Sequence, residues 1–199
     1  MTELLLLRHS IAEGNQDKRY LGCRTDTLLR PEGEALAQEK AAKLPPCQAL
    51  YTSSMLRALQ TGCILFPDLE PEIIPGMEEM DFGDFEGKKQ SDIAELPEYI
   101  EWIKGGMDAC PPNGEKFGDF SLRCISGLDV IFSDMMAKDV TRAAVVTHGG
   151  VITNLLSGYG LPKGRPADYM CGPGEGFEII LSTFLWQKGP AFEISGRII

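Results

Sequence analysis

Both histidines of the chain stand directly after short apolar runs. Residues 4–7 are four leucines that lead into Arg8 and His9, and the run 143–147 leads into His148. Short apolar runs of this length are typical of buried parallel strands. Because ligands of open α/β sheets bind at the carboxyl ends of the strands, we expect these polar side chains to meet at one edge of one sheet.

Arg57 is the third candidate, in the segment SSMLRALQT, near the start of a helix for which Ser53 is the predicted N-cap. A helix N-terminus attracts anions, and an arginine there adds a fork that fits phosphate oxygens. Taken singly, a surface arginine or a structural histidine is the more ordinary interpretation. Two imidazoles and two guanidiniums at one sheet edge instead indicate transfer of a dianion, with one nucleophile and the rest stabilising charge.

A phosphoryl-transfer site also needs a proton donor for the leaving alcohol. The loop GMEEMDFGDFEGK, residues 76–88, offers five carboxyl groups, which are those of Glu78, Glu79, Asp81, Asp84 and Glu86. A solvated acidic loop is the alternative interpretation, and composition alone does not choose among the five.

Strands and helices alternate around these residues. The predicted strands are 4–7, 49–52, 72–74, 143–147, 177–183 and 191–194. The predicted helices are 31–44, the segment after Ser53, segments near 92–104, 120–136 and a start at 151–157, with 105–118 a loop. This alternation predicts an α/β fold with a mainly parallel sheet. Without an internal repeat or linker, residues 1–199 are expected to form a single domain.

The composition narrows the class of partner. Of the 199 residues, 43% are hydrophobic and 24% charged, as in soluble globular proteins, and the net charge of -10 disfavours nucleic acid. No apolar run approaches the roughly 20 residues that span a bilayer, and no signal peptide is recognised. A cytoplasmic protein with no membrane partner is therefore predicted. In a cytosolic chain, the six scattered cysteines are expected to be free thiols or small core fillers.

Four segments, in this order, resemble the signature blocks of the histidine phosphatase superfamily, the phosphoglycerate mutase-like proteins: RHSIAEGN, SSMLRALQTG, EEMDFGDFEGK and VVTHGGVI. RYLGCRTD, residues 19–26, together with the helix at Pro31, resembles the branch with α-ribazole phosphatase and the cofactor-dependent mutases. The resemblance covers residues 4–151. It implies a sheet flanked by helices on both faces, and a small cap inserted at roughly 88–124.

The resemblance also implies roles for particular residues. His9 would be the nucleophile that becomes a phosphohistidine, Glu79 the acid/base, and His148 the third catalytic residue. Contacts to phosphate are implied for Arg8, Asn15, Arg57, Ser10 and Gly149. No metal and no cofactor is expected.

The chain departs from the family pattern beside His9. Ser10 stands where the family has glycine, and Ile11-Ala12 where it has a glutamate and a threonine. Ser10 is expected either to crowd the phosphate or to supply a hydroxyl donor. These changes bear on substrate class and rate and leave the catalytic set whole.

The leading hypothesis is a phosphomonoesterase that hydrolyses a small phosphorylated metabolite through phosphohistidine. A phosphoglycerate mutase-type transfer is the alternative, and the short segment between Glu79 and His148 favours the phosphatase. A non-catalytic regulatory relative would be expected to have lost His9 or Glu79. A metal hydrolase is disfavoured because no HxH or HExxH spacing is present.

The sequence does not name the substrate and leaves a homodimer open. The side chains of the predicted cap that could face either ligand or solvent are Trp102, Lys104, Lys116, Phe117, Phe120 and Arg123.

Overall fold

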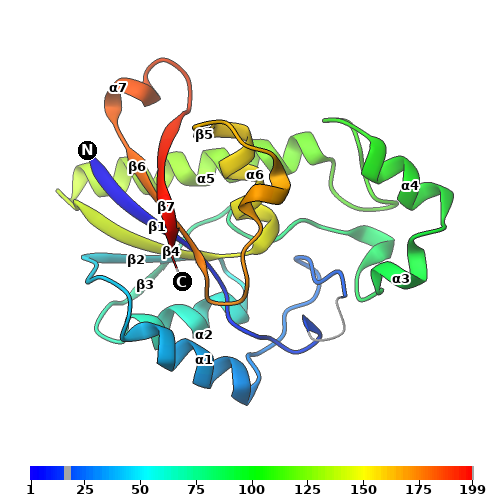
Figure 1. Cartoon of the computed structure of the whole chain (residues 1–199), viewed down its shortest axis with the longest axis horizontal. Helices are drawn as coiled ribbons and strands as arrows, with labels where there is room; N and C mark the ends of the chain where they lie inside the picture. The colour runs from blue at the N-terminus through cyan, green and yellow to red at the C-terminus, as the bar shows by residue number, and fades with distance from the viewer. Residues whose placement is uncertain (16–18, 199) are drawn as a thin grey trace.

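The computed structural model describes residues 1–15 and 19–198. Within these ranges the strands form one seven-stranded sheet in the order β3-β2-β4-β1-β6-β7-β5 (Figure 1). The strands are β1 (Thr2–Arg8), β2 (Ala49–Thr52), β3 (Pro71–Ile73), β4 (Arg142–Thr147), β5 (Gly160–Leu161), β6 (Gly176–Leu181) and β7 (Phe192–Ile198). Strands β3, β2, β4 and β1 are parallel neighbours, whereas β6 runs antiparallel to both β1 and β7. The predicted α/β class with a mainly parallel sheet is confirmed.

Helices cover both faces of the sheet. They are α1 (Pro31–Ala41), α2 (Leu56–Leu65), α3 (Gln90–Ile93), α4 (Pro97–Lys104), α5 (Phe117–Ala137), α6 (Gly149–Tyr159) and α7 (Thr183–Trp186), with short 3-10 turns η2 (Gly83–Phe85) and η3 (Pro166–Tyr169). Helices α1 and α2 lie on one face and α5 and α6 on the other, while α3 and α4 stand to one side (Figure 1). No helix within the described ranges is both long and apolar enough to cross a membrane.

The four leucines of β1 are buried because the strand lies at the centre of the sheet. Leu5 and Leu7 pack into the core beneath α1 and α2, and Leu4 and Leu6 pack into the core beneath α5 and α6. Since side chains alternate faces along a strand, a strand covered on both faces has to be apolar at every position. All four side chains are fully buried.

The end of β1 brings the two histidines together. Arg8 is opposite Thr147 of the parallel neighbour β4, and the N–H of His9 donates to the Thr147 carbonyl at 2.9 Å. His148 follows Thr147 directly, so the two imidazole centroids lie 5.2 Å apart. The predicted meeting of the histidines at one edge of the sheet is confirmed.

The start of α2 differs from the prediction that Ser53 caps it. Met55 is the N-cap, without a side-chain cap bond, and the N–H of Leu56 donates to the carboxylate of Asp26 at 2.8 Å. The Ser53 prediction is wrong because the helix begins two residues later and the Ser53 hydroxyl bonds to His148. The first N–H of this helix is therefore occupied by a carboxylate and is not free for an anion.

Two strand ends at the C-terminal side also differ from the prediction. Strand β6 ends at Leu181 because Ser182 accepts the N–H of Leu185 and caps the short helix α7. Strand β7 continues past the predicted end to Ile198, paired with β6 across an irregularity beside Glu178. The segment 90–104 forms two helices, α3 and α4. Helix α4 begins with a proline, which is tolerated in the first turn because the N–H groups there have no partner within the helix.

Candidate active site

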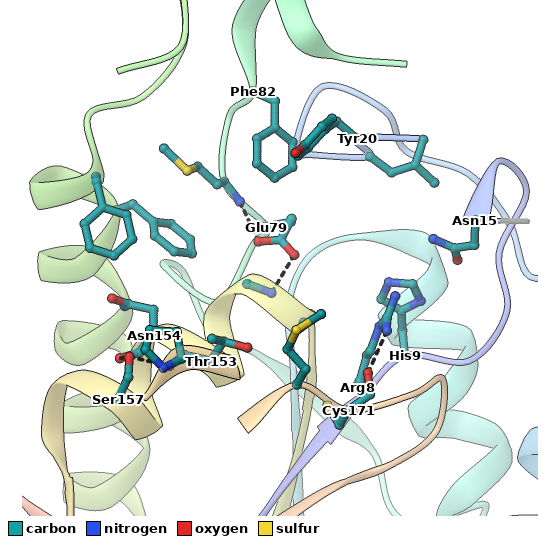
Figure 2. Close-up of a pocket in the computed structure, with 18 of the residues that line it drawn as sticks. Arg8, His9, Asn15, Tyr20, Glu79, Phe82, Thr153, Asn154, Ser157 and Cys171 are labelled. Atoms are coloured by element: carbon teal, nitrogen blue, oxygen red, sulfur yellow. Dashed lines mark hydrogen bonds between the residues drawn. The ribbon is translucent and has the colours of Figure 1, made fainter. Parts of the chain in front are cut away.

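A pocket of about 600 Å³ opens at the carboxyl ends of β1 and β4 (Figure 2). Five of the predicted site residues line it, which are Arg8, His9, Asn15, Glu79 and Gly149. Aromatic side chains line another part of the wall, which are Tyr20, Phe82, Trp102, Phe117 and Phe120. The pocket therefore joins a polar end to an apolar body.

His9 is held as a neutral imidazole with one free nitrogen. Its Nδ1 lies 2.7 Å from the carbonyl oxygen of Ser10, and since a carbonyl only accepts, Nδ1 carries the proton. Burial, followed by the charges of Arg57 and Arg8, lowers the pKa of His9 to about 3. At neutral pH, Nε2 therefore keeps its lone pair and can act as a nucleophile.

His148 is fully buried behind His9, at the N-cap of α6. Its Nε2 lies 2.7 Å from the Ser53 hydroxyl, and its Nδ1 is buried without a hydrogen-bond partner. Burial, together with the neighbouring His9 and arginines, holds the pKa of His148 well below its usual value. Because the Ser53 hydroxyl already accepts the Met55 N–H, we assign it as the donor to Nε2, which leaves Nδ1 as an N–H donor that can serve an anion.

Each of the two arginines has a buried Nε without a partner. Arg8 donates from Nη1 to the carbonyl of Cys171 at 2.7 Å. Arg57 is fully buried and donates from its terminal nitrogens to carbonyls of the loop 21–25, one of them that of Thr25 at 2.6 Å. Buried donors are rarely left unsatisfied. Together with His148 Nδ1, these two Nε–H groups lie near His9 and favour negative charge there. Of the three residues, Arg8 lines the pocket, whereas Arg57 and His148 are not among its lining residues.

Glu79 is the one carboxylate of the acidic loop that lines the pocket. Its two oxygens accept the N–H groups of Met80 and Gly150, each at 2.9 Å. Burial raises the pKa of Glu79, against the opposing effect of these bonds and of Arg57. A buried carboxyl group with a raised pKa is suited to proton transfer.

The other four acidic side chains of the loop are bonded elsewhere. Glu78 accepts from Ser54 and the Gly76 N–H, Asp81 from Arg24 and the Gly83 N–H, Asp84 from Asn113, and Glu86 from Thr25 and the N–H groups of Gly22 and Arg24. These bonds fold the loops around the site and turn the four groups away from the pocket.

The structure does not bring the Ser10 side chain to the pocket. Its hydroxyl donates to the carbonyl of Gly33 at 2.7 Å, and its N–H donates to Thr61 at 3.0 Å. Ser10 is fully buried with an ordinary backbone conformation, so it neither crowds the pocket nor offers a hydroxyl to a ligand. Asn15 does line the pocket, with Oδ1 accepting the Ala12 N–H at 2.9 Å (Figure 2).

Two residues beside the site were not predicted from the sequence. Gly150 donates to Glu79, and a Cβ at position 150 would overlap the Glu79 carboxylate, so any larger residue there would have to displace that side chain. The small residues after His148 in THGG were the available signal. Ser53, predicted as a helix cap, instead orients His148, and no local pattern distinguishes these two uses of a serine.

Some side chains of the predicted cap line the pocket and others are exposed to solvent. Trp102, Phe117 and Phe120 line the pocket, whereas Lys104 and Lys116 are exposed. No group of three or more His, Cys, Asp or Glu side chains within residues 1–15 and 19–198 is arranged to hold a metal ion.

Known proteins with similar sequences belong to one family. Residues 4–173 match the family model of the histidine phosphatase superfamily (branch 1). The adenosylcobalamin/α-ribazole phosphatase of Salmonella typhimurium is 30% identical over 162 residues, which cover 77% of each chain. A 2,3-bisphosphoglycerate-dependent phosphoglycerate mutase of Chlamydia caviae is 23% identical over 216 residues, covering 85% of this chain and 94% of the mutase.

Solved structures agree on the fold. The α-ribazole phosphatase of Shigella flexneri has a TM-score of 0.81 at 23% identity, covering 100% of this chain and 96% of that one. A phosphoglycerate mutase from Thermus thermophilus has a TM-score of 0.71 at 27% identity, covering 100% and 99%. The chain therefore belongs to the histidine phosphatase superfamily, branch 1, as an enzyme of the phosphatase class.

Proposed function

We propose that the protein hydrolyses phosphate monoesters in two steps, through a phosphohistidine at His9. The observation that carries the proposal is a neutral imidazole beside three buried N–H donors that have no partner, with Glu79 in the same pocket. Such an arrangement offers a nucleophile, stabilisation of phosphoryl charge and a proton donor.

In the first step, Nε2 of His9 attacks the phosphorus atom and the P–O bond to the alcohol breaks. Glu79 gives its proton to the departing oxygen, so the alcohol leaves neutral and Glu79 becomes a carboxylate. The imidazole, now bonded to phosphorus at Nε2 and protonated at Nδ1, gains positive charge. The Ser10 carbonyl, which accepts this Nδ1–H, stabilises that charge.

In the second step, a water oxygen attacks the phosphorus atom while the Glu79 carboxylate takes a proton from that water molecule. The N–P bond breaks, phosphate is released, and His9 and Glu79 return to their starting protonation states. Arg8, Arg57 and His148 stabilise the charge on the equatorial oxygens in both steps.

The wall of the pocket supports a phosphatase over a mutase. Arg8 and Arg19 are the cationic residues among the described residues that line it, and the apolar lining residues include Leu21, Met80, Phe82, Trp102, Phe117, Phe120 and Met170. A phosphoglycerate carries a carboxylate beside its phosphate and would gain little from such a wall. We therefore expect a small phosphorylated metabolite whose alcohol is largely apolar.

The location that fits this proposal is the cytoplasm. All six cysteines are free, as expected in a reducing compartment.

The proposal is tested by trapping the intermediate. The enzyme is mixed with a labelled aryl phosphate and quenched in alkali, where phosphohistidine survives, and the labelled peptide is identified. We expect label on the peptide that contains His9, and no label in His9→Asn, whose amide can still donate to the Ser10 carbonyl. Label that persists in a folded His9→Asn protein would assign the nucleophile elsewhere.

The same reaction separates the phosphatase from the mutase. With 3-phosphoglycerate added, we expect the label to appear as inorganic phosphate at an unchanged rate. Quantitative transfer of label to phosphoglycerate would establish the mutase instead.

A further inference from the structure

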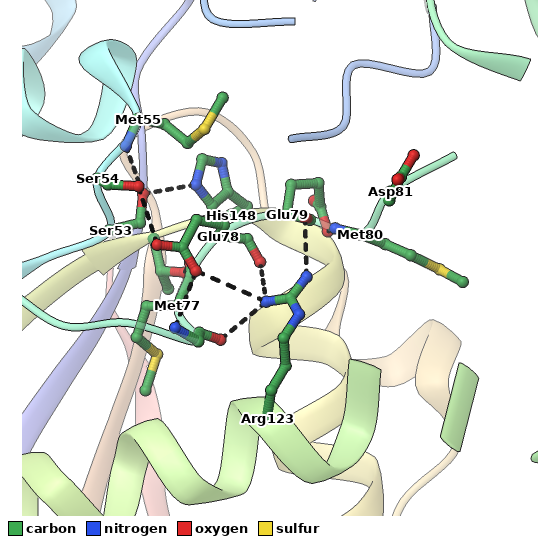
Figure 3. A network of polar contacts seen from close by, with 12 residues as sticks. Ser53, Ser54, Met55, Met77, Glu78, Glu79, Met80, Asp81, Arg123 and His148 are labelled. Atoms are coloured by element: carbon green, nitrogen blue, oxygen red, sulfur yellow. Dashed lines mark hydrogen bonds and ion pairs between the residues drawn. The ribbon is translucent and has the colours of Figure 1, made fainter. Parts of the chain in front are cut away.

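Arg123 of α5 reaches across to the loop that carries Glu79 and donates to its backbone carbonyls (Figure 3). All five N–H donors of its guanidinium are bonded, three to this loop and two to Glu115. Two donors make a fork onto the Glu115 carboxylate, from Nε at 2.7 Å and from Nη2 at 2.9 Å. The remaining three go to backbone carbonyls, those of Gly76 at 2.9 Å, Glu78 at 2.7 Å and Glu79 at 3.0 Å.

These bonds fix Glu79 from its backbone side. The carbonyl of Glu79 is held by Arg123, and its carboxylate is held on the other side by the N–H groups of Met80 and Gly150. Gly76, which has a φ of +93°, permits the close approach, because a Cβ there would meet the backbone of Arg123. The proton donor is therefore clamped at both of its polar groups.

Arg123 also contacts the wall of the pocket. Its guanidinium lies 4.9 Å from the centroid of the Phe120 ring, and Phe120 lines the pocket. Glu115 precedes α5 and also bonds the backbone of Asp81 in the acidic loop. Its N–H donates to the Asp81 carbonyl, and its carboxylate accepts the Asp81 N–H. The guanidinium thus lies between the aromatic wall and the loop of the acid.

We infer that Arg123 is a positioning residue, which keeps the Glu79 carboxyl group in place for proton transfer and links that position to the aromatic wall. This inference rests on the proposed role of Glu79. Arg123 is not among the residues that line the pocket, so its effect should appear only where the proton matters.

The test compares leaving groups in single-turnover phosphorylation of His9. An alkyl phosphate needs a proton on its leaving oxygen, whereas a nitrophenyl phosphate leaves as a stable phenolate. Arg123→Lys keeps the charge and loses the fork, so we expect the alkyl rate to fall about 10- to 100-fold more than the nitrophenyl rate. Glu79→Gln should show the same selectivity more strongly.

Arg142→Lys is the matched control. Arg142 also pairs with a glutamate, Glu3, but at the opposite end of β4 from His148. We expect its ratio of alkyl to nitrophenyl rates to equal that of the wild type. Glu115→Gln keeps Arg123 but removes the charge of its partner and replaces one acceptor oxygen of the fork by an amide nitrogen. It should shift the ratio in the same direction as Arg123→Lys and carries the test if Arg123→Lys does not fold.

The outcomes separate the two ideas. If Glu79→Gln shows the selectivity and the folded Arg123 and Glu115 variants do not, Arg123 has only a structural role and the proposed function stands. Equal losses for both substrates in Arg123→Lys would overturn the inference in the same way. If Glu79→Gln shows no selectivity, Glu79 is not the proton donor and the inference fails with it.

Discussion

At the scale of single residues, the site depends on keeping protons in defined places. The Ser10 carbonyl holds the proton of His9 on Nδ1, and two nearby arginines favour the neutral ring. Arg57 can keep its charge beside His9 while fully buried, because loop carbonyls accept hydrogen bonds from its terminal nitrogens. Its Nε remains for a ligand. The same side chain therefore both anchors the loop and adds charge to the site.

Arg57→Lys should accordingly be a severe change. A lysine keeps the charge but has no planar fork, so it cannot bond the loop carbonyls and a phosphoryl oxygen together. We expect turnover of nitrophenyl phosphate to fall about 10²- to 10³-fold. Arg30→Lys is the control, because the Arg30 side chain is partly exposed and pairs with Glu32 at the start of α1. Turnover within twofold of wild type in a folded Arg57→Lys protein would contradict the assignment.

At the scale of elements, the start of α6 organises the proton donor. His148 is the N-cap, and Gly149 and Gly150 form the first turn, from which the Gly150 N–H bonds Glu79. Burial raises the pKa of Glu79, and this hydrogen bond partly opposes the rise. The start of the helix therefore both orients the carboxyl group and limits the rise of its pKa, so we expect a side chain at position 150 to affect function.

Gly150→Ala should reduce activity, although alanine is the better helix former. Its Cβ would overlap the Glu79 carboxylate and displace it, so the phosphorylation rate with an alkyl phosphate should fall about 10²-fold. Gly158→Ala is the control in the same helix, since no other atom lies near its Cβ position. That change should leave the rate unaltered and raise the free energy of unfolding by about 0.5–1 kcal/mol. Equal rates in both variants would show that Glu79 has room to move.

At the scale of the whole molecule, the neutral imidazole in the site affects the stability of the fold. His9 takes up a proton near pH 6.5 when the chain is unfolded and only near pH 3 when it is folded. Between these values the unfolded state binds the extra proton, so stability falls as the pH falls. This contribution is complete above pH 6.5 and is lost on approach to pH 3.

Removal of His9 should therefore make the protein less sensitive to acid. The free energy of unfolding in urea, measured between about pH 4 and pH 5.5, should rise less steeply with pH in His9→Asn than in wild type. The difference in slope should be about 1.4 kcal/mol per pH unit, the value for one proton. His148, whose pKa is also lowered in the folded protein, and the carboxylates contribute to both slopes, so the comparison uses only their difference. Parallel curves would mean that His9 titrates normally in the folded protein.

The sequence by itself determined the strands and the pattern of the site. Four leucines in a row predict a central strand because such a strand is covered on both faces, and β1 has that burial. The alternation of strands and helices predicts a mainly parallel sheet, at whose carboxyl edge His9 and His148 are expected, and β1 and β4 are parallel neighbours. These features can be predicted because they depend on the composition of short segments and on the order of those segments along the chain.

The tertiary structure alone decided how individual polar groups are used. Ser53 was predicted as a helix cap, yet its hydroxyl bonds His148, 95 positions away. Which of five acidic side chains faces the pocket depended on partners in other loops, such as Thr25 for Glu86. Arg123 lies 44 positions from the Glu79 carbonyl that it holds. A hydrogen bond is formed between groups that the fold brings together, so its partner is not specified by neighbours in the sequence.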